Sequence, residues 1–340
     1  MERRRIRMED LAERCGVSVA TVSRVLADRP GVRPELRRRI RDAAALLGYA
    51  MPSAVAGRKA ILVASQAAMV DYARSQFTLH VLDGMRDRAA ALGMTLETRT
   101  ATEPLAANLA ADEDAAGYVL LTPESDAVIA EAAALDRPVV LVNADDPMMR
   151  LSSVAPCNRT AAARATELLL RHGHRRILFL TRPGRRTIER RREGWADRLM
   201  AEGIVPEPSL VVEVDDWLPD AAAAAVTRRL TEAPRDFTAI LAAGDSLAVG
   251  ALLALARAGI DVPGEVSVLG FDGLPQCDLQ TPPLSAVEIP MRTIGSLALD
   301  LLGEIISGPG LPPRRVELAC RIVERGSTGP ASIPPTAPAG

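Results

Sequence analysis

The chain has 340 residues, 48% of them hydrophobic and 25% charged, which predicts a well-folded protein of two or three compact units. The net charge of −2 conceals an asymmetry. Residues 1–60 carry 14 basic and 7 acidic side chains, a net +7, whereas the remainder carries 27 and 36, a net −9. Only the first segment has the charge of a polyanion binder.

The four cysteines, Cys15, Cys157, Cys277 and Cys320, lie far apart without a CxxC pair. This spacing argues against a zinc site and a secreted disulfide framework, and it fits a reducing cytoplasm. No apolar run approaches the roughly 20 residues of a membrane helix, and the N-terminus lacks the apolar region of a signal peptide. We therefore expect a cytoplasmic protein without membrane association.

Enzyme classes lack their characteristic residues. The chain contains three histidines and has no HExxH, GxSxG or P-loop sequence, so neither metal-dependent hydrolysis nor a Ser-His-Asp arrangement is supported. We predict no catalytic residues, no bound metal and no cofactor. His172 and His174 flank a helix-to-strand turn and are interpreted as a helix C-terminal cap rather than a catalytic pair.

The basic segment has the pattern of a small helical domain. Residues 8–15 predict a short helix, residues 16–18 a turn, and residues 19–26 a second helix with Ser18 as its N-cap. This pair is a helix-turn-helix. A third helix is expected from Pro34, because apolar residues recur on one stripe at Leu36, Ile40, Ala43, Ala44 and Leu47.

From residue 60 onward, short buried strands alternate with helices. The strands are AILVAS, MTLETR, GYVLLT, PVVLVN, RILFLT, LVVEV, TAILAA and EVSVLGF, and the helices span 77–92, 124–135, 158–172, 187–203, 219–233 and 245–259. This alternation is typical of α/β folds with parallel sheets. The series restarts near Asn158, so we predict two doubly wound lobes facing a ligand cleft at the strand carboxyl ends. Asp245 is expected to cap the helix that it begins.

These patterns predict a helix-turn-helix domain over 1–50, a short hinge over 51–59 and a larger domain over 60–326. Within the larger domain, the first lobe is expected over about 60–157 plus 289–316 and the second over about 158–288 plus 317–326. The Pro-, Ser- and Ala-rich residues 327–340 are expected to be a disordered tail.

The strings GVSVATVSRVL and LGYAMPSA resemble the lactose-repressor (LacI/GalR) family of bacterial transcription regulators. The strings GHRRILFL, GDSLAVGALLALARAGIDVPGEVSVLGFDG and TPPLSAVEIP resemble the effector domain of the same family, which has the periplasmic-binding-protein-like type I fold. The resemblance implies a sequence-specific regulator, by default a repressor, whose affinity for double-stranded operator DNA is controlled allosterically by a small metabolite. A homodimer is favoured, because no tetramerising leucine-heptad tail is visible.

The resemblance assigns DNA contacts to the second helix. In the family this helix enters the major groove, so Val19 and Ala20 would face bases while Thr21 and Ser23 would contact phosphates. Arg24 can bind guanine O6 and N7 in bidentate fashion, worth about 1–3 kcal/mol of discrimination. A solvated helix surface is an equal alternative for Ser23. Ser18 completes the predicted DNA-binding set on this helix.

The cap of the first helix and the hinge both depart from the family pattern. Arg7 replaces the usual threonine cap of the first helix. The sequence Gly57-Arg58-Lys59 replaces the hinge leucine that wedges into the minor groove, so we expect a weaker operator bend. Val55 is the only branched apolar side chain there that could substitute for the leucine.

The resemblance also implies an effector pocket. In the family, an arginine three residues before a Gly-aromatic pair contacts effectors, which here selects Arg191. Arg185 and Thr187 match polar contacts, Trp217 an aromatic that stacks on the ligand, and Asp272 a carboxylate that accepts ligand hydroxyls. The remaining predicted pocket residue is Phe77. A core-edge position for Trp217 and a surface-loop position for Arg185 remain alternatives.

Six arginines fall within residues 182–192, at the start of a predicted helix. This concentration favours an anionic effector, a sugar acid or sugar phosphate bound by Arg185 and Arg191 together. A solvated basic face is the alternative. Two rival functions remain: a DNA-binding regulator without an effector, suggested by Cys157 and Gly244 at positions where the family has polar partners, and a solute-binding protein without a regulatory role.

Overall fold

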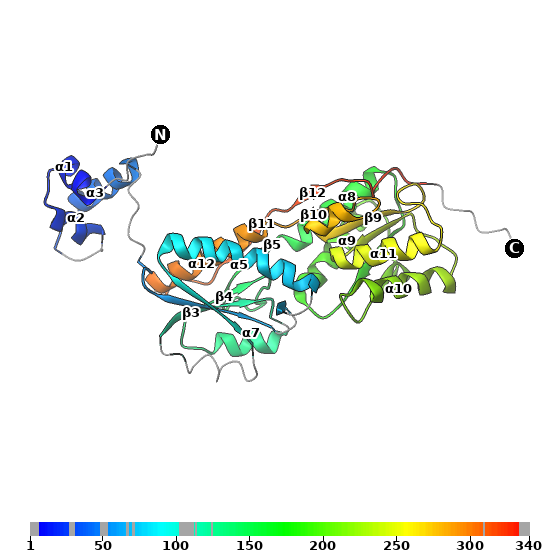
Figure 1. Cartoon of the computed structure of the whole chain (residues 1–340), viewed down its shortest axis with the longest axis horizontal. Helices are drawn as coiled ribbons and strands as arrows, with labels where there is room; N and C mark the ends of the chain where they lie inside the picture. The colour runs from blue at the N-terminus through cyan, green and yellow to red at the C-terminus, as the bar shows by residue number, and fades with distance from the viewer. Residues whose placement is uncertain are drawn as a thin grey trace. The chain divides into compact units, whose positions relative to one another are not determined.

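The computed structural model describes residues 7–26, 31–47, 54–65, 68, 69, 72–101, 112, 114–123, 125–308 and 310–332. Its contacts divide the chain into two units (Figure 1). One unit comprises residues 1–58 with 89–95, and the other comprises residues 59–88 with 96–340. The predicted link sequence at 48–52 lies outside the described residues.

The first unit contains the three predicted helices, α1 (Met8–Cys15), α2 (Val19–Leu26) and α3 (Pro34–Leu47). Leu11, Val22, Val25 and Ile40 are fully buried at their junction, as the apolar spacing predicts. Gly16 ends α1 with a φ of 62°, a left-handed conformation that glycine adopts without a Cβ penalty. These residues form a compact helix-turn-helix domain.

Hydrogen bonds stabilise the N-termini of α1 and α2. The Ser18 hydroxyl accepts a hydrogen bond from the Thr21 backbone N–H at 3.1 Å, which confirms the predicted N-cap of α2. At α1, where Arg7 replaces a threonine, the Asp10 carboxylate accepts a hydrogen bond from the Arg7 N–H at 2.7 Å. The acidic third residue of α1 thus satisfies the Arg7 N–H, which is the reciprocal bond of a capping box, and it also interacts favourably with the helix dipole.

The second unit contains two six-stranded sheets. The first has the order β11-β5-β4-β3-β1-β2. Its strands are β1 (Lys59–Ala64), β2 (Thr95–Thr100), β3 (Ala115–Leu121), β4 (Val139–Val142), β5 (Ser152–Pro156) and β11 (Arg315–Leu318). Helices α5 (Tyr72–Leu92) and α12 (Met291–Ser307) lie on one face and α7 (Asp126–Ala133) on the other (Figure 1). Because both faces are covered, the central strand β4 is apolar throughout and β1 is apolar after Lys59.

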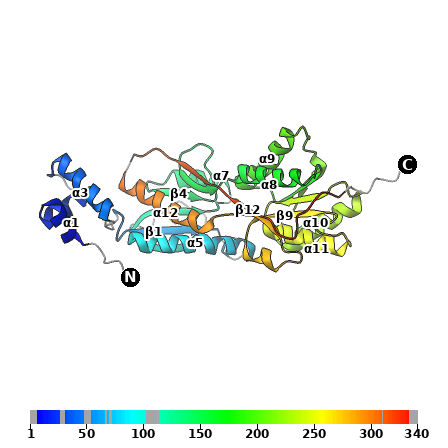
Figure 2. The ribbon, with the colours of Figure 1, turned by 90° about the horizontal axis from the view of Figure 1, so that it is seen from above.

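The second sheet has the order β12-β10-β9-β8-β6-β7. Its strands are β6 (Ile177–Thr181), β7 (Val211–Glu213), β8 (Ala239–Ala242), β9 (Ser267–Asp272), β10 (Ser285–Glu288) and β12 (Arg321–Val323). Helices α8 (Asn158–Arg171) and α9 (Arg186–Ala201) cover one face, and α10 (Pro219–Glu232) and α11 (Asp245–Arg257) the other (Figure 2). The predicted fold, a helical head followed by two doubly wound lobes, is confirmed. The sequence reading had not identified β5, β10, β11 and β12 as strands.

The chain passes between the two sheets three times. Residue 157 separates β5 from α8, residues 289 and 290 separate β10 from α12, and residues 319 and 320 separate β11 from β12. Any change in the angle between the lobes must therefore bend these three short segments.

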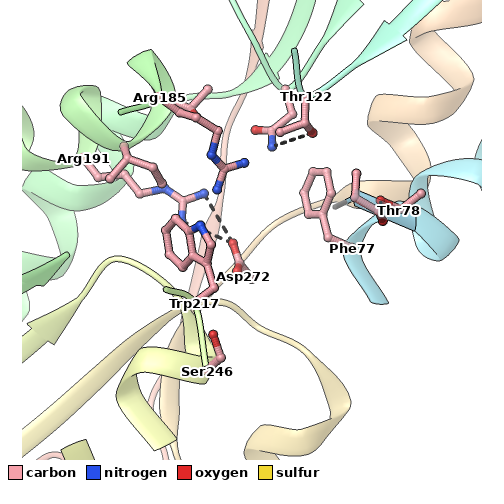
Figure 3. Close-up of a pocket in the computed structure, with 12 residues that line it drawn as sticks. Phe77, Thr78, Thr122, Arg185, Arg191, Trp217, Ser246 and Asp272 are labelled. Carbon is pink, nitrogen blue, oxygen red and sulfur yellow. Dashed lines mark hydrogen bonds and ion pairs between the residues drawn. The ribbon is translucent and has the colours of Figure 1, made fainter. Parts of the chain in front are cut away.

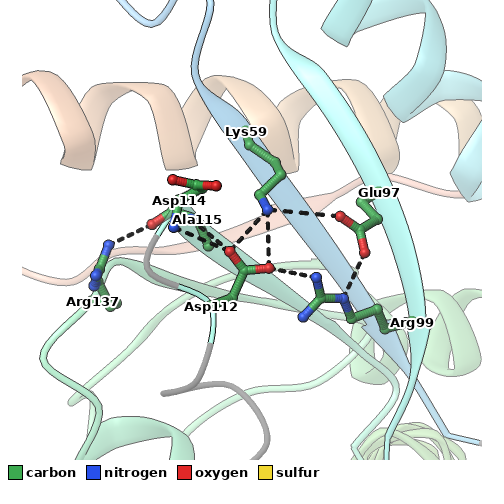
Figure 4. Close-up of polar contacts among 7 residues, drawn as sticks. All are labelled: Lys59, Glu97, Arg99, Asp112, Asp114, Ala115 and Arg137. Atoms are coloured by element: carbon green, nitrogen blue, oxygen red, sulfur yellow. Dashed lines mark hydrogen bonds and ion pairs between the residues drawn. The ribbon is translucent and has the colours of Figure 1, made fainter.

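The predicted hinge over 51–59 ends one residue too late, because Lys59 is the first residue of β1. Its ammonium group lies 2.8 Å from an Asp112 carboxylate oxygen and 3.9 Å from Glu97 (Figure 4). Arg99 also binds both carboxylates. The hydrogen bond from Lys59, followed by that from Arg99, lowers the pKa of Asp112 to about 2. These ion pairs hold the start of β1 within the first sheet.

The predicted disordered tail is wrong for residues 327–332, while residues 333–340 lie outside the described part of the chain. The Ser327 hydroxyl donates to Val268 O at 2.6 Å and accepts from the Ser285 N–H at 2.8 Å. The predicted helix cap at His172 and His174 is confirmed, because His172 is the C-cap residue of α8 and the His174 N–H donates to Leu169 O at 3.1 Å. The buried His174 ring also lies 3.1 Å from the Gly329 carbonyl oxygen. Backbone and small hydroxyl side chains therefore attach this segment to the second sheet, which composition alone does not reveal.

This attachment predicts a pH-dependent stability. Burial lowers the pKa of His174 below its ordinary value of 6.5, so the unfolded chain binds more protons than the folded one below about that pH. The free energy of unfolding is expected to fall as pH drops from 7 to 5.5, and less steeply in His174→Gln. Denaturant titrations at several pH values measure both slopes. His172→Gln is the control, and an equal reduction in both variants would contradict the role of His174.

Candidate functional site

Helix α2 separates its apolar and polar positions cleanly. Val22, Val25 and Leu26 are buried in the helical core. The predicted DNA-contacting positions face solvent instead: Ser18, Val19, Ala20, Ser23 and Arg24 are exposed and Thr21 is half-buried. The Thr21 hydroxyl also lies 2.9 Å from the Ser18 hydroxyl, so these two side chains are positioned together at the helix N-terminus. The exposed hydroxyl groups at the helix N-terminus are suited to phosphates. The exposed guanidinium of Arg24, on the last turn of the same helix, is suited to base edges.

Val55 does not occupy the position that the predicted wedge requires. It lies in a turn over 54–57 and is 2% exposed. The turn is held by a hydrogen bond from the Gly57 N–H to Gly93 O at 2.8 Å. A wedge must present its side chain to the base steps, so Val55 is not available for this role in the conformation observed.

All six residues predicted to bind the effector line one cavity of about 50 Å³ between the two lobes (Figure 3). The second lobe contributes Arg185, Thr187, Ile188, Arg191, Trp217, Ser246 and Asp272. The first lobe contributes Ala68, Phe77, Thr78, Thr122 and Asn143. An outer hollow of about 390 Å³ shares Asn143, Arg185 and Thr187 with the cavity. Arg185 therefore lies at the boundary between an inner and an outer space.

Arg191 is the most deeply buried of these charges, with 4% of the residue exposed. Its Nε donates to Asn158 Oδ1 at 2.8 Å and its Nη1 to Ala243 O at 2.5 Å. Nη1 and Nη2 both lie 3.3 Å from Asp272 Oδ1. Protein acceptors thus occupy four of the five guanidinium N–H groups, and direct binding of an anionic ligand by Arg191 stays a prediction.

Asp272 presents a carboxylate at the end of β9. Its side chain is 23% exposed, and burial raises its pKa while Arg191 and Arg185 oppose the shift. One oxygen is bound to Arg191, and the side chain points into the cavity (Figure 3). Together Arg185, Arg191 and Asp272 give the pocket a formal charge of +1, much less basic than the run of arginines suggested.

Trp217 lies against Gly244 and beneath Arg185. The Arg185 guanidinium carbon is 5.0 Å from the centroid of the indole ring, a cation–π geometry. A Cβ at residue 244 would lie 3.1 Å from Trp217 Cζ3, closer than an ordinary van der Waals contact, so any larger residue would press on the ring. The glycine that replaces a polar residue of the family pattern is thus explained by this tryptophan. Trp217 Nε1 is buried without a protein hydrogen-bond partner.

Three residues that line the cavity have an unusual backbone conformation, and the sequence did not predict two of them, Thr122 and Asn143. Thr122, Asn143 and Asp272 have φ values of 50°, 53° and 116°, in the left-handed region that non-glycine residues rarely adopt. All three follow or end strands of the parallel sheets and line the cavity. Such strain concentrates at ligand-binding sites. A polar residue directly after a buried strand, as in PVVLVN and GYVLLT, was the signal that could have identified Asn143 and Thr122.

The polar atoms of Asn143 are unequally satisfied. Its Nδ2 lies 3.4 Å from Thr122 Oγ1, whereas its Oδ1 is buried without a protein partner. With Trp217 Nε1, the cavity thus contains one acceptor and one donor whose hydrogen-bonding capacity the protein leaves unused. A buried polar group without a partner costs about 1–3 kcal/mol, so a ligand hydroxyl or water is expected at each.

Asp245 does not cap α11 as predicted. The N-cap position belongs to Gly244, and Asp245 is the first helical residue. Its carboxylate is fully buried and accepts a hydrogen bond from the Leu274 N–H at 2.7 Å. Burial, and then the charge of Asp272, raise the pKa of Asp245 well above its usual range. Asp245 therefore positions the loop that follows Asp272.

Ion pairs join the two lobes outside the cavity. Asp145, which follows β4 and is 6% exposed, lies 3.1 Å from Arg190 and 3.9 Å from Arg186, both on α9. Arg315 of the first lobe lies 2.9 Å from the same carboxylate. Opening the lobes would separate Asp145 from α9 while leaving Arg315 in place. The relative position of the lobes is thus sensitive to any ligand that changes the α9 N-terminus.

In the part of the chain that the structure describes, no helix is long and apolar enough to cross a membrane. The same residues contain no group of three or more His, Cys, Asp or Glu side chains that could hold a metal ion.

Comparison with solved structures supports the fold. The chain matches a transcriptional regulator CelR–cellobiose complex at 27% identity and a TM-score of 0.69, covering 95% of this chain and all of the other. It also matches the lac repressor dimer bound to operator and the anti-inducer ONPF at 25% identity and a TM-score of 0.70, covering 95% and 99% of the two chains.

Sequence comparison identifies both parts of the chain. Residues 7–52 match the bacterial regulatory proteins of the lacI family, and residues 166–328 match a periplasmic binding protein-like domain. The chain is 30% identical to the HTH-type transcriptional regulator reg1 of Streptomyces lividans, over 96% of this chain and 97% of the relative. It is 29% identical to the HTH-type transcriptional repressor CytR of Escherichia coli K12, over 94% and 96%. The chain therefore belongs to the lacI family of bacterial regulatory proteins and is a DNA-binding transcription regulator rather than an enzyme.

Proposed function

We propose that this regulator is a cytoplasmic, homodimeric repressor whose operator affinity is controlled by a sugar-like effector in the interlobe cavity. The observation that supports the proposal most strongly is the cavity itself. Six residues chosen from the sequence meet there, and two buried polar atoms, Asn143 Oδ1 and Trp217 Nε1, have no protein partner. A dimer fits this role because one recognition helix reads too few bases alone.

The proposed DNA-reading residues divide by chemistry. Val19 and Ala20 have no hydrogen-bonding atoms and can discriminate only by shape and by contact with thymine methyl groups. Arg24 is exposed on the last turn of α2 and can reach a guanine edge. Ser18, Thr21 and Ser23 supply hydroxyl groups for phosphates. Arg24 is therefore the residue on which we expect base preference to depend most.

The proposed effector is polyhydroxylated, because the cavity offers complementary polar atoms beside an aromatic ring. Asp272 and Asn143 Oδ1 would accept ligand hydroxyls, and Trp217 Nε1 would donate to a ligand oxygen. Phe77 and the indole ring supply apolar contact. The inner cavity of about 50 Å³ holds roughly three or four waters, so a sugar ring requires a wider opening between the lobes or movement of Arg185 from Trp217.

The positive charge of Arg185 favours anionic over neutral polyhydroxylated ligands. Arg191 is neutralised by Asp272, so Arg185 is the positive charge that a carboxylate or phosphate could approach from the outer hollow. We propose that a sugar acid or sugar phosphate binds more tightly than the matching neutral sugar for this reason. The role of Arg191 is to position Asp272.

The proposed allosteric step is a change in lobe angle. An effector at the N-terminus of α9 would alter the pairing of Arg186 and Arg190 with Asp145 across the lobes. Rotation of the lobes then changes the spacing of the two DNA-binding heads in the dimer. Couplings of this kind are worth about 1–3 kcal/mol, or roughly 5- to 150-fold in operator affinity.

The two rival functions make different predictions for the same measurements. A regulator without an effector would show no calorimetric binding of any sugar, sugar acid or sugar phosphate. Gly244 does not support this rival function, because its small size accommodates Trp217. A solute-binding protein without a regulatory role would show no sequence-specific DNA binding, in spite of the net +7 over residues 1–60.

The DNA-binding proposal is tested by selecting bound sequences from random duplexes. We expect a two-fold symmetric site, and binding that weakens by orders of magnitude between about 50 and 200 mM salt if roughly 6–10 phosphates are contacted. Arg24→Ala should lose about 1–3 kcal/mol and relax preference at one base pair of each half-site. Thr21→Ala should weaken all sequences alike. If Arg24→Ala changes only the salt dependence, Arg24 contacts a phosphate instead.

The effector proposal is tested with matched ligands. Each neutral sugar is titrated by calorimetry beside its acid and its phosphate, and we expect the anionic member to bind about tenfold more tightly, the usual size of one charged hydrogen bond. Arg185→Ala should abolish the difference. Arg192→Ala is the control, because Arg192 is on the same helix but does not line the cavity. Tighter binding of the neutral member by both proteins would refute the preference for an anion.

The contact between Gly244 and Trp217 gives a further prediction. A methyl group at residue 244 would crowd the indole ring and displace it, at about 1–3 kcal/mol for an overpacked site. Gly244→Ala should therefore weaken effector binding and shift the fluorescence of Trp217. Measurements in a Trp195→Phe background isolate that signal. Unchanged affinity with a shifted spectrum would show that the ring does not contact the ligand.

A further inference from the structure

Two of the four cysteines lie on segments that connect the lobes. Cys157 separates β5 from α8, and Cys320 lies between β11 and β12. Strands β5 and β11 are parallel neighbours whose last pair is Pro156 with Leu318. The Cys157 N–H then donates to Leu318 O at 2.9 Å. The two segments thus remain hydrogen bonded where the chain leaves the first sheet.

The two thiols are in contact. The Cys320 thiol donates to Leu318 O at 3.8 Å, and this is the same oxygen that accepts the hydrogen bond from the Cys157 N–H. The two cysteines therefore meet at one backbone carbonyl, and each acts on the pKa of the other through a side-chain contact. Both cysteines are reduced in the structure.

Their environments differ in a way that suits a reactive thiol and its partner. Cys157 is half-buried at the N-cap position of the 14-residue helix α8, whereas Cys320 is 5% exposed. The hydrogen bond from Cys320 lowers the pKa of Cys157 to about 6, against the opposing effect of burial and of Glu317. The Cys320 pKa is raised because its thiol donates that bond, although Arg191 opposes the rise.

The remaining cysteines have no such arrangement. Cys15 is 4% exposed within the helical head. Cys277 is fully buried, and burial followed by the Asp245 charge raises the pKa of its thiol. Neither is paired with a second cysteine among the described contacts, so both serve as internal comparisons.

We propose that Cys157 and Cys320 form a redox-sensitive pair that a hydroperoxide converts into a disulfide between two of the interlobe connections. The Cys157 thiolate attacks the hydroperoxide, ROOH; the S–O bond forms, the O–O bond breaks and an alcohol leaves after taking a proton. The Cys320 sulfur then displaces hydroxide from the Cys157 sulfenic acid. The S–S bond forms, and the Cys320 proton leaves with the hydroxide as water. Two thiols lose two electrons and the hydroperoxide gains them.

The disulfide would act on the part of the molecule that must move. A covalent bond between residues 157 and 320 restrains two of the three connections that bend when the lobe angle changes. It also adjoins the pocket, because Asn158 follows Cys157 directly and binds Arg191 at 2.8 Å. Oxidation is thus a second input to the regulator, separate from the effector. A cytoplasmic disulfide of this kind is transient and reversed by thiol reductants.

The pairing is tested on the full-length reduced protein with hydrogen peroxide, followed by peptide mapping and thiol counting. We expect two of the four thiols to be lost within one chain, with Cys157 and Cys320 in one disulfide-linked peptide, and both to return with a thiol reductant. Cys320→Ser should instead accumulate a sulfenic acid at residue 157. Cys157→Ser should retain its three thiols at the same dose, and Cys15→Ser should behave as the unmodified chain. Earlier loss of Cys15 or Cys277, or oxidation without a 157–320 link, would overturn the proposal.

The pH dependence provides an independent check. The thiolate is present above the pKa of Cys157, so the rate of oxidation should rise about tenfold between pH 5 and 7 and then level off. An ordinary thiol would continue to accelerate about sixteenfold between pH 7 and 8.5, and that result would contradict the assignment. Charged groups facing the pair are Glu317 of β11, Arg191 of α9 and Arg164 of α8, whose Nη1 donates to Cys320 O at 2.9 Å.

The conformational consequence is measured separately by amide hydrogen exchange. Peptides covering residues 150–160 and 315–325 should exchange more slowly in the oxidised protein, and Cys320→Ser treated in the same way should show no slowing. A disulfide that forms with unchanged exchange in both segments would exclude a restraint on the lobes. This readout requires neither the effector nor the operator, so it remains decisive if the proposed function fails.

Discussion

The pocket of this regulator depends on one buried guanidinium. Arg191 joins α8 through Asn158, the end of β8 through Ala243 O, and the end of β9 through Asp272. The guanidinium carbon of Arg191 lies 3.7 Å from the centroid of the Phe271 ring. Removing one partner of a buried charged pair costs about 3–5 kcal/mol, because the other charge is left uncompensated. The carboxylate that points into the cavity is therefore held in place by an arginine whose guanidinium is bound mainly to protein acceptors.

The same arrangement explains why the cavity lies where it does. Two parallel sheets point their carboxyl ends at one another, and the loops that leave those ends carry polar residues in unusual backbone conformations. Thr122 and Asn143 come from the first lobe, and Asp272 from the second. A ligand that bridges them must hold the two lobes at one angle. The interlobe pairs of Asp145 with Arg186 and Arg190 stabilise that angle from outside the cavity.

The three connections between the lobes restrict the angle at which the lobes can lie. Each is only one or two residues long, so little flexibility is available to absorb a rotation. The contact between Cys157 and Cys320 joins two of them, beside the residue that binds Arg191. Effector chemistry and thiol chemistry would thus act on the same movement through neighbouring residues.

The sequence by itself determined the helices of the head and the two-lobe α/β fold, because these depend on local patterns. The resemblance to the lactose-repressor family selected the six residues that line the cavity. Apolar spacing placed Val22, Val25 and Ile40 in the core, and a long ordered motif carried Arg191 and Asp272. The pocket residues Thr122 and Asn143 were missed, since their importance lies in positive φ values that only the folded strand ends impose.

Tertiary structure alone decided what each charge is paired with. Arg191 was predicted to bind an anion, but the fold brings it to Asp272, so the run of arginines overstated the positive charge of the pocket. Asp245 was predicted to cap its helix, but it accepts a hydrogen bond from Leu274, 29 residues later. The segment 327–332 was predicted to be disordered, but buried hydroxyl and carbonyl groups of the second sheet bind it. In each case the partner is distant in the sequence, and hydrogen bonding between distant residues leaves no local pattern by which it could have been predicted.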